Sequence, residues 1–118
     1  MTFEQILDGF RRRGIVRGGE ILLTPGDALD VVSRCEASDL AVIGIEGMQV
    51  NDDHTTPLQD LIADCSSVSA TTWNEYRDVA SACSRAFLAR LPARPSLFVS
   101  LAAISAVEWD SQRPNRPA

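Results

Sequence analysis

The stretch Leu40–Ser66 (LAVIGIEGMQVNDDHTTPLQDLIADCS) decides the fold, because it contains two apolar runs separated by a polar segment. The runs are Leu40–Val50 and Leu58–Cys65, and the segment between them contains Asn-Asp-Asp and a proline. Short runs of Val, Ile and Met bounded by turn residues are typical of paired β-strands. The stretch therefore predicts a β-hairpin over about residues 40–66, around which the rest of the chain is arranged.

The register of this hairpin is predicted from its turn. If the turn centres near residue 55, Glu46 lies opposite Asp64 and Met48 lies opposite Ile62. Two carboxylates opposed across strands repel each other, so such a pair requires solvent, a shared proton or a cation. Alternation along the first strand divides its side chains into two sets, with Ile43 and Ile45 on one face and Val42, Glu46, Met48 and Val50 on the other.

Three helices are predicted from capping residues and apolar spacing. Thr2 and Gln5 fit a capping box, and apolar residues at helical spacing follow them, so a helix is expected over about residues 3–13, with Gly14 as its left-handed stop. A Thr-Pro-Gly-Asp start predicts a second helix over about residues 25–37. Thr72 and Glu75 form a third capping signature, which precedes a helix over about residues 73–91.

The last apolar segment completes the predicted sheet. Ser96–Val107 is almost unbroken in its hydrophobicity, which favours a strand buried on both faces and placed centrally beside the hairpin, although its Ala-rich end could instead be helical. Glu20–Leu23 is long enough only for an edge strand or an extended connector. The sequence thus predicts a single α+β domain over residues 1–110, with a mostly antiparallel sheet of three to four strands covered by three helices. Residues 111–118 are predicted to be a disordered tail.

Composition argues against a membrane-spanning, a secreted or a nucleic-acid-binding protein. No apolar run approaches the roughly 20 residues that span a bilayer, and the N-terminus lacks the basic region of a secretory signal. The three cysteines, Cys35, Cys65 and Cys83, are an odd number in apolar contexts, which favours reduced core thiols in a cytoplasmic protein. A net charge of −5 argues against nucleic acid as a partner, because phosphate neutralisation needs a basic face.

Negative charge is concentrated in the middle of the chain. Between Arg34 and Arg77 there is no Lys or Arg, and there are eight carboxylates. One interpretation is an electronegative surface that captures a basic partner, and the alternative is a solvated rim that keeps the protein soluble. Under the first interpretation the partner-binding residues are Glu46, Asp52, Asp53, Asp60 and Asp64, with Trp109 as an exposed contact residue.

The same segment contains residue types that could bind a metal ion or act as a nucleophile. Asp52, Asp53 and His54, with Asp60, could ligate a cation, but their spacing matches neither a calcium loop nor a paired-His zinc site. Cys65 or Ser66 with His54 would make a nucleophilic pair only if the loop folded back onto its strand, and no Gly-x-Ser-x-Gly turn is present. The sequence therefore predicts neither an enzyme nor a cofactor or metal site.

The segment Ala41–Ser66, followed by a capped Trp-containing helix and an apolar closing strand, resembles the immunity protein 40 family of bacterial toxin–immunity systems. The matching features are Gly-Ile-Glu-Gly at Gly44–Gly47, Leu-Ile-Ala-Asp at Leu61–Asp64, and the helix–strand end. The resemblance implies a small cytoplasmic α+β protein that neutralises a polymorphic toxin by binding it, without catalysis of its own.

Three functions follow as hypotheses. The leading one is an immunity protein whose acidic hairpin docks against a basic protein toxin domain and blocks it sterically. The second is a small-molecule or metal-binding domain that uses Glu46, Asp64 and the loop acids. The third is a homodimer or structural subunit that pairs through a strand edge or Trp109.

Overall fold

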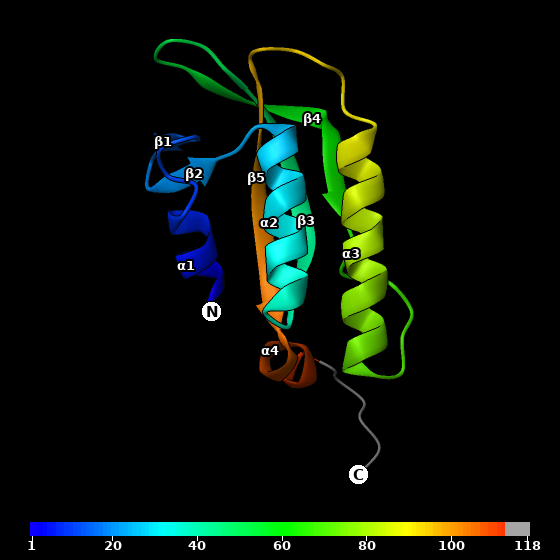
Figure 1. Cartoon of the computed structure of the whole chain (residues 1–118). Helices are drawn as coiled ribbons and strands as arrows, with labels where there is room; N and C mark the ends of the chain where they lie inside the picture. Colours follow the sequence, from blue (N-terminus) through cyan, green and yellow to red (C-terminus); the bar gives the residue numbers. More distant parts are fainter. Residues whose placement is uncertain (113–118) are drawn as a thin grey trace.

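The predicted hairpin is present as two long antiparallel strands, β3 (Leu40–Val50) and β4 (Thr55–Asp64). A computed structural model describes residues 1–112 of the chain. In it, β5 (Leu97–Ser105) pairs antiparallel with the other side of β3, so the sheet order is β4-β3-β5 (Figure 1). The prediction of an antiparallel α+β domain built on this hairpin is confirmed.

A small second sheet extends the first. It consists of β1 (Ile15–Arg17) and β2 (Glu20–Leu22), joined by Gly18 and Gly19 with φ angles of 57° and 82°. Glycine adopts a positive φ without steric cost, which is why a pair of glycines suits this turn. Directly after β2, Leu23 and Val99 exchange two backbone hydrogen bonds of 2.9 and 2.7 Å, which attach the small hairpin to β5.

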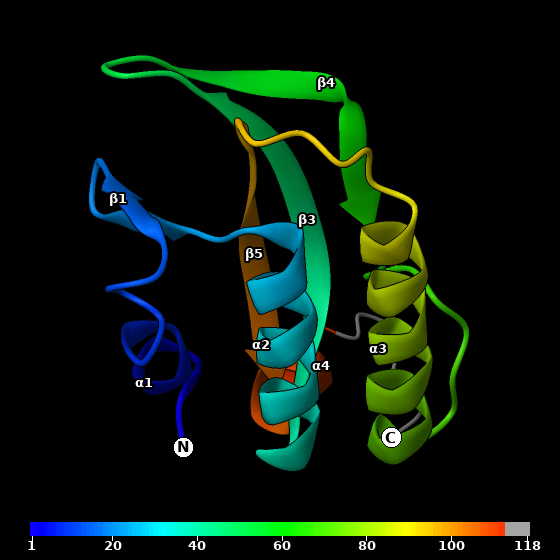
Figure 2. The same cartoon turned by 45° about the horizontal axis from the view of Figure 1, so that its top comes forward.

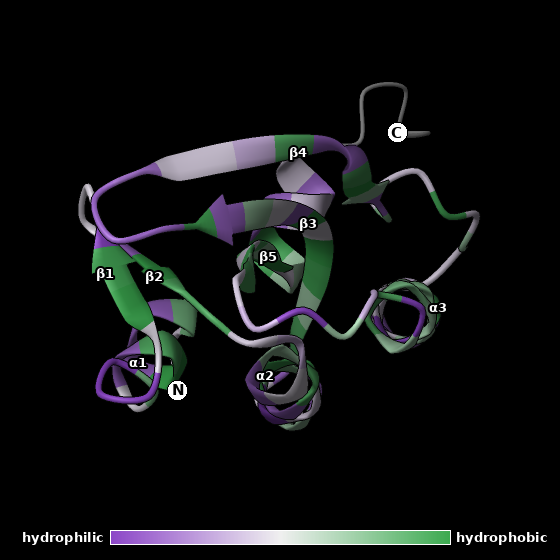
Figure 3. Ribbon diagram, turned by 90° about the horizontal axis from the view of Figure 1, so that it is seen from above, coloured by the Kyte–Doolittle hydropathy of each residue, from purple (hydrophilic) through white to green (hydrophobic). Residues whose placement is uncertain are grey.

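Four helices complete the described chain: α1 (Phe3–Asp8), α2 (Pro25–Ala37), α3 (Trp73–Ala89) and α4 (Ala106–Ser111). Each has a Thr or Ser cap whose side chain accepts a backbone N–H of the first turn. Seen from above, α1, α2 and α3 lie in a row on one side of the strands, and β4 lies on the far side (Figure 3). The Ser84 hydroxyl of α3 donates to the Val42 carbonyl, which fixes α3 to β3.

The main core lies between this helix row and the sheet. It brings together apolar side chains of α1, α2, the strands and the end of α3, including Phe10, Leu23, Val32, Ile45 and Val99. Two smaller clusters lie at either end of the sheet. One joins β1 and β2 to the upper part of β3 and β5, and the other joins α3 and α4 to the lower part of β3.

Several predicted boundaries are wrong for identifiable reasons. The first helix ends at Asp8 and not near residue 13, and residues up to Gly14 continue as successive turns that still bury Phe10. Gly14 is not a left-handed stop, since the only glycines of positive φ within residues 1–112 are Gly18 and Gly19. It is glycine because a Cβ there would lie 2.5 Å from the Leu22 carbonyl oxygen.

The third predicted helix is confirmed and ends two residues earlier, at Ala89, and the second is confirmed as Pro25–Ala37. The C-terminal strand is correctly placed beside the hairpin but lies at the edge of the three-stranded sheet, where β3 is central. Its Ala-rich end is helical, as α4. Of the predicted disordered tail, Ser111 belongs to α4, and residues 113–118 lie outside the described part of the chain.

The hairpin register also differs from the prediction. Glu46 lies opposite Ile62, and Met48 lies opposite Pro57, so Glu46 and Asp64 are not directly opposed. Residues 58–61 of β4 bulge out opposite a single residue of β3, Gly47, where a Cβ would lie 2.7 Å from that of Leu61. Figure 2 shows the bend that this bulge introduces into β4.

A second irregularity lies between Val42 and Gly44 of β3. It places Val42 in the same core cluster as Ile45, while Ile43 packs with Ala41 in another cluster. The predicted alternation of Ile43 and Ile45 against Val42 is therefore wrong, because an extra residue in a strand reverses the faces of those that follow it.

Candidate functional site

Among residues 1–112, no helix covers one of the two faces at the middle of the sheet (Figure 3). On β3, Gly44 pairs with Asp64 and Ala102, and Glu46 pairs with Ile62 and Ser100. Because directly paired residues on neighbouring strands share a face, these side chains lie together on the side away from α2. Glu46, Asp64 and Ala102 are exposed, and Ile62 has an exposed fraction of 48%. We call this surface, together with Glu20 of β2, the acidic open face.

Both ends of the acidic open face are closed by packing. At one end, the hairpin of β1 and β2 packs Leu22 and Ile15 against Met48, Val50 and Phe98. At the other end, Ala41 and Ile104 are covered by aromatic side chains of α3 and α4. The uncovered region is therefore bounded and does not continue over the whole sheet.

A groove of about 270 Å³ lies in this bounded region. It is lined by two small residues, Gly44 and Ala102, and by Glu46 and Ile62. Glu20 reaches into it from β2, where its carboxylate accepts a hydrogen bond from the Ser100 hydroxyl. The groove thus combines two carboxylates with an exposed apolar side chain.

In the described part of the chain, the carboxylates of the acidic open face are not neutralised by arginines. Within residues 1–112, no arginine forms an ion pair with Glu20, Glu46 or Asp64. The Ser66 hydroxyl and amide both donate to Asp64, the amide at 2.9 Å, and they hold the pKa of that carboxyl below its usual range. Asp64 is therefore ionised at neutral pH, and the face has a negative potential available to a partner.

No pattern in the sequence predicts that Glu20 belongs to this surface. It follows two glycines in a short edge segment, outside the acidic stretch, and its partner Ser100 lies 80 residues further along the chain. Only the Leu23–Val99 bridge brings the two residues together.

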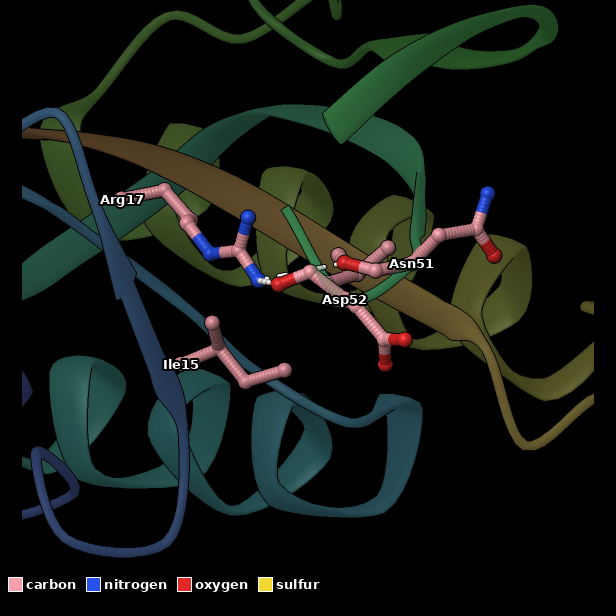
Figure 4. Close-up of a pocket in the computed structure, with 5 residues that line it drawn as sticks. Ile15, Arg17, Asn51 and Asp52 are labelled. Carbon is pink, nitrogen blue, oxygen red and sulfur yellow. Dashed lines mark hydrogen bonds between the residues drawn. The ribbon is translucent and has the colours of Figure 1, made fainter. Parts of the chain in front are cut away.

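Two other predicted residues, Asp52 and Asp53, lie apart from this face at the exposed tip of the hairpin. The Arg17 guanidinium of β1 donates to the carbonyl oxygens of Asn51 and Asp52 at 3.2 and 2.9 Å. The Asp52 carboxylate points away from Arg17, and these residues line a shallow groove of about 440 Å³ (Figure 4). Arg17 therefore binds the backbone of the hairpin tip, and the carboxylates of Asp52 and Asp53 remain exposed.

Asp60 occupies a third place, in the bulge of β4. It lines a groove of about 230 Å³ together with Pro92 and Arg94, which follow α3. The five predicted acids therefore do not form one surface: Glu46 and Asp64 share the open face, Asp52 and Asp53 share the tip, and Asp60 is separate. The bulge is the cause, because it turns the outer half of β4 away from the inner half.

The acidic stretch is also partly neutralised at its ends. Glu36 accepts from Arg85, and Asp39 accepts from Arg77 at 2.8 Å. The indole N–H of Trp73 donates to Asp39 at 2.7 Å and, with Arg77, holds the pKa of that carboxyl below its usual range. These two acids are structural, since they tie the C-terminal end of α2 to α3.

The prediction that Trp109 is an exposed contact residue is wrong. Its ring lies 5.9 Å from that of Trp73 and 5.2 Å from that of Tyr76, and it is half-buried in this cluster. Trp109 therefore closes the lower end of the sheet, because α4 folds back against the start of α3.

The cysteines also differ from the prediction. Cys65 and Cys83 form a disulfide between the end of β4 and α3, and Cys35 is a free buried thiol whose pKa burial raises to about 12. Disulfides persist mainly in oxidising compartments, so the cysteines no longer argue for the cytoplasm. Since Cys65 is bonded to Cys83, it is not available as a nucleophile for His54.

The geometry does not support the cation site that was considered for His54 and the acids near it. In the part of the chain that the structure describes, no three His, Cys, Asp or Glu side chains come together to hold a metal ion. His54 and the neighbouring tip acids therefore do not assemble the cation site considered from the sequence. No helix among residues 1–112 has the length and apolarity needed to cross a membrane.

Comparison with protein-family models, with curated proteins and with solved structures gives no match for this chain. The class of protein is therefore defined by the fold and the site alone. It is a small α+β domain with a bounded, acidic and uncovered sheet face.

Proposed function

We propose that the protein is a stoichiometric inhibitor of the immunity-protein type, which binds a basic toxin domain through the acidic open face. The observation that carries this proposal is that Glu20, Glu46 and Asp64 form no ion pair with an arginine among residues 1–112, although other acids of the chain do. Unpaired carboxylates on one face steer a cationic partner towards it and fix its orientation.

The groove adds a reason for protein rather than small-ligand binding. It is open to solvent and carries two carboxylates, and its exposed apolar group, Ile62, lies beside Glu46. Protein interfaces combine an apolar centre with a charged rim in this way, whereas small-molecule sites are usually deep and largely apolar. The shape and charge of the face fit an Arg- or Lys-rich protein surface.

Gene context and growth provide the first test. The proposal predicts that the neighbouring gene encodes a large secreted protein with a toxic C-terminal domain. Coexpression of that domain with this chain is expected to restore growth and to yield a one-to-one complex in size-exclusion chromatography. If the domain kills cells equally well with and without the chain, the immunity proposal is wrong.

Charge removal identifies the docking surface. Glu20→Gln with Glu46→Gln is expected to weaken binding of the toxin domain by about tenfold, mainly through slower association, and to flatten its salt dependence. The tip variant Asp52→Asn with Asp53→Asn also removes two negative charges, but from the hairpin tip, so it compares the tip with the acidic open face. Surface plasmon resonance at two salt concentrations measures both effects.

The matched control is Asp30→Asn with Asp78→Asn, which changes the net charge equally on the exposed sides of α2 and α3. It is expected to leave the dissociation constant within about twofold of the unmodified chain. If all three double variants weaken binding to the same extent, overall charge and not the acidic open face determines affinity.

A further inference from the structure

The two outer edges of the three-stranded sheet are protected differently. The outer strand β4 carries Pro57, a bulge over residues 58–61, and the charged residues Asp60 and Asp64. These are the features by which natural sheets prevent another strand from pairing at an edge. The other outer strand, β5, has the sequence LFVSLAAIS and contains neither a proline nor a charge.

Part of the outer edge of β5 has no strand paired with it in the described part of the chain. Val99 uses its outward N–H and C=O groups in the bridge to Leu23. In an antiparallel strand the outward groups recur at every second residue, so those of Leu101 and Ala103 point the same way. Within residues 1–112, no strand pairs with β5 at these two positions on that side.

Grooves lie on both sides of this edge. On the α1 side, a groove of about 290 Å³ is lined by four apolar residues, Phe3, Leu7, Ile21 and Leu101, and also by Glu4 and by Arg11, whose guanidinium is paired with Asp8. On the other side lies the acidic groove with Glu46. Glu20, Ser100 and Leu101 line both grooves, so the two are adjacent across the strand edge.

We propose that the outer edge of β5 receives an extended segment of the partner as an additional strand. Side chains alternate along a strand, so the apolar residues of this segment enter the α1 groove and its basic residues face Glu20 and Glu46. The inference rests on the proposed function and specifies how the basic partner is held. A second copy of this chain is a poorer occupant, because each copy carries a net charge of −5 and would bring acids against acids.

A peptide probe tests strand addition directly. The probe is a capped peptide of about nine alternating arginine and valine residues, and its control has the same charge with the central valine replaced by proline. Binding is followed by amide hydrogen exchange of the ¹⁵N-labelled full chain. The alternating peptide is expected to slow exchange of the Leu101 and Ala103 amides by about tenfold or more, and the proline peptide is expected to bind about tenfold more weakly.

The outcomes separate strand addition from charge attraction. If both peptides bind equally and neither protects Leu101 and Ala103, strand addition is wrong, while the acidic open face remains the docking surface. Failure of both peptides to bind also overturns strand addition, and growth rescue then tests the proposed function separately. If the free chain already protects these amides in a concentration-dependent way, a second copy occupies the edge and the proposal is wrong.

A variant gives a second readout. Ala103→Pro removes one outward N–H without removing a charge, and it is expected to reduce affinity for the alternating peptide by about tenfold while leaving that for the proline peptide unchanged. Circular dichroism establishes that the variant is folded. Equal affinity of the folded variant and the unmodified chain for the alternating peptide would overturn the proposal.

Discussion

Removal of the Cys65–Cys83 disulfide is expected to lower the free energy of unfolding by about 3 kcal/mol and the melting temperature by roughly 10 °C. The bond joins residues separated by 18 positions, and it restricts the unfolded chain over that loop. It also holds the end of β4 against α3, next to Asp64 of the acidic open face. Calorimetry of the chain with and without reductant measures the change.

Two controls belong to this experiment. Cys65→Ala with Cys83→Ala should melt near the reduced chain and should not respond to reductant. Alkylation of the unfolded, unreduced chain should label one thiol, that of Cys35, and alkylation after reduction should label three. Three labelled thiols without reduction would show that the bond does not form, and the predicted loss of stability would then be absent.

Gly14→Ala is expected to lower the free energy of unfolding by about 2–3 kcal/mol. An added Cβ would lie 2.5 Å from the carbonyl oxygen of Leu22, which belongs to the backbone of β2 and cannot rotate away. The hairpin of β1 and β2 would have to move, and Leu22 would lose its packing against Met48 and Val50. Urea denaturation followed by fluorescence of the two tryptophans measures the loss.

Gly26→Ala provides the matched control for this substitution. Gly26 lies in the first turn of α2, and a Cβ there would meet nothing within 4 Å. The same chemical change is expected to stabilise the chain by about 0.4–1 kcal/mol, because it restricts the unfolded state without a clash. Equal destabilisation by both substitutions would mean that the close approach at Gly14 does not determine the effect.

Much of the fold could be predicted from local patterns. The helix at Pro25–Ala37 follows from a capping threonine and an N-terminal proline, and the hairpin follows from two apolar runs around a polar turn. These features act between residues close in sequence, so the sequence displays them directly. The predicted length of the first helix is too great because Phe10 continues the apolar spacing. Phe10 is buried, but it belongs to a turn that follows the helix.

The site was predicted less well, because it depends on pairing between distant segments. The count of carboxylates in the middle of the chain predicts Glu46 and Asp64 as partner-binding residues, and the structure shows that both are exposed. It could not indicate that a bulge opposite Gly47 separates them from Asp60, or that Glu36 and Asp39 meet arginines of α3. It also missed Glu20, which reaches the site through the bridge between Leu23 and Val99.

The sequence by itself determined the class of fold, the central hairpin, two of the helices and the sign of the charge in the middle of the chain. These depend on side-chain spacing, capping and composition, which do not require knowledge of distant contacts. Only the tertiary structure decided which acids share a face, that Trp109 is packed against Trp73 and Tyr76, and that Cys65 bonds to Cys83. The physical reason is that strand register and bulges set which side chains meet, and one extra residue in a strand reverses the face of every residue beyond it.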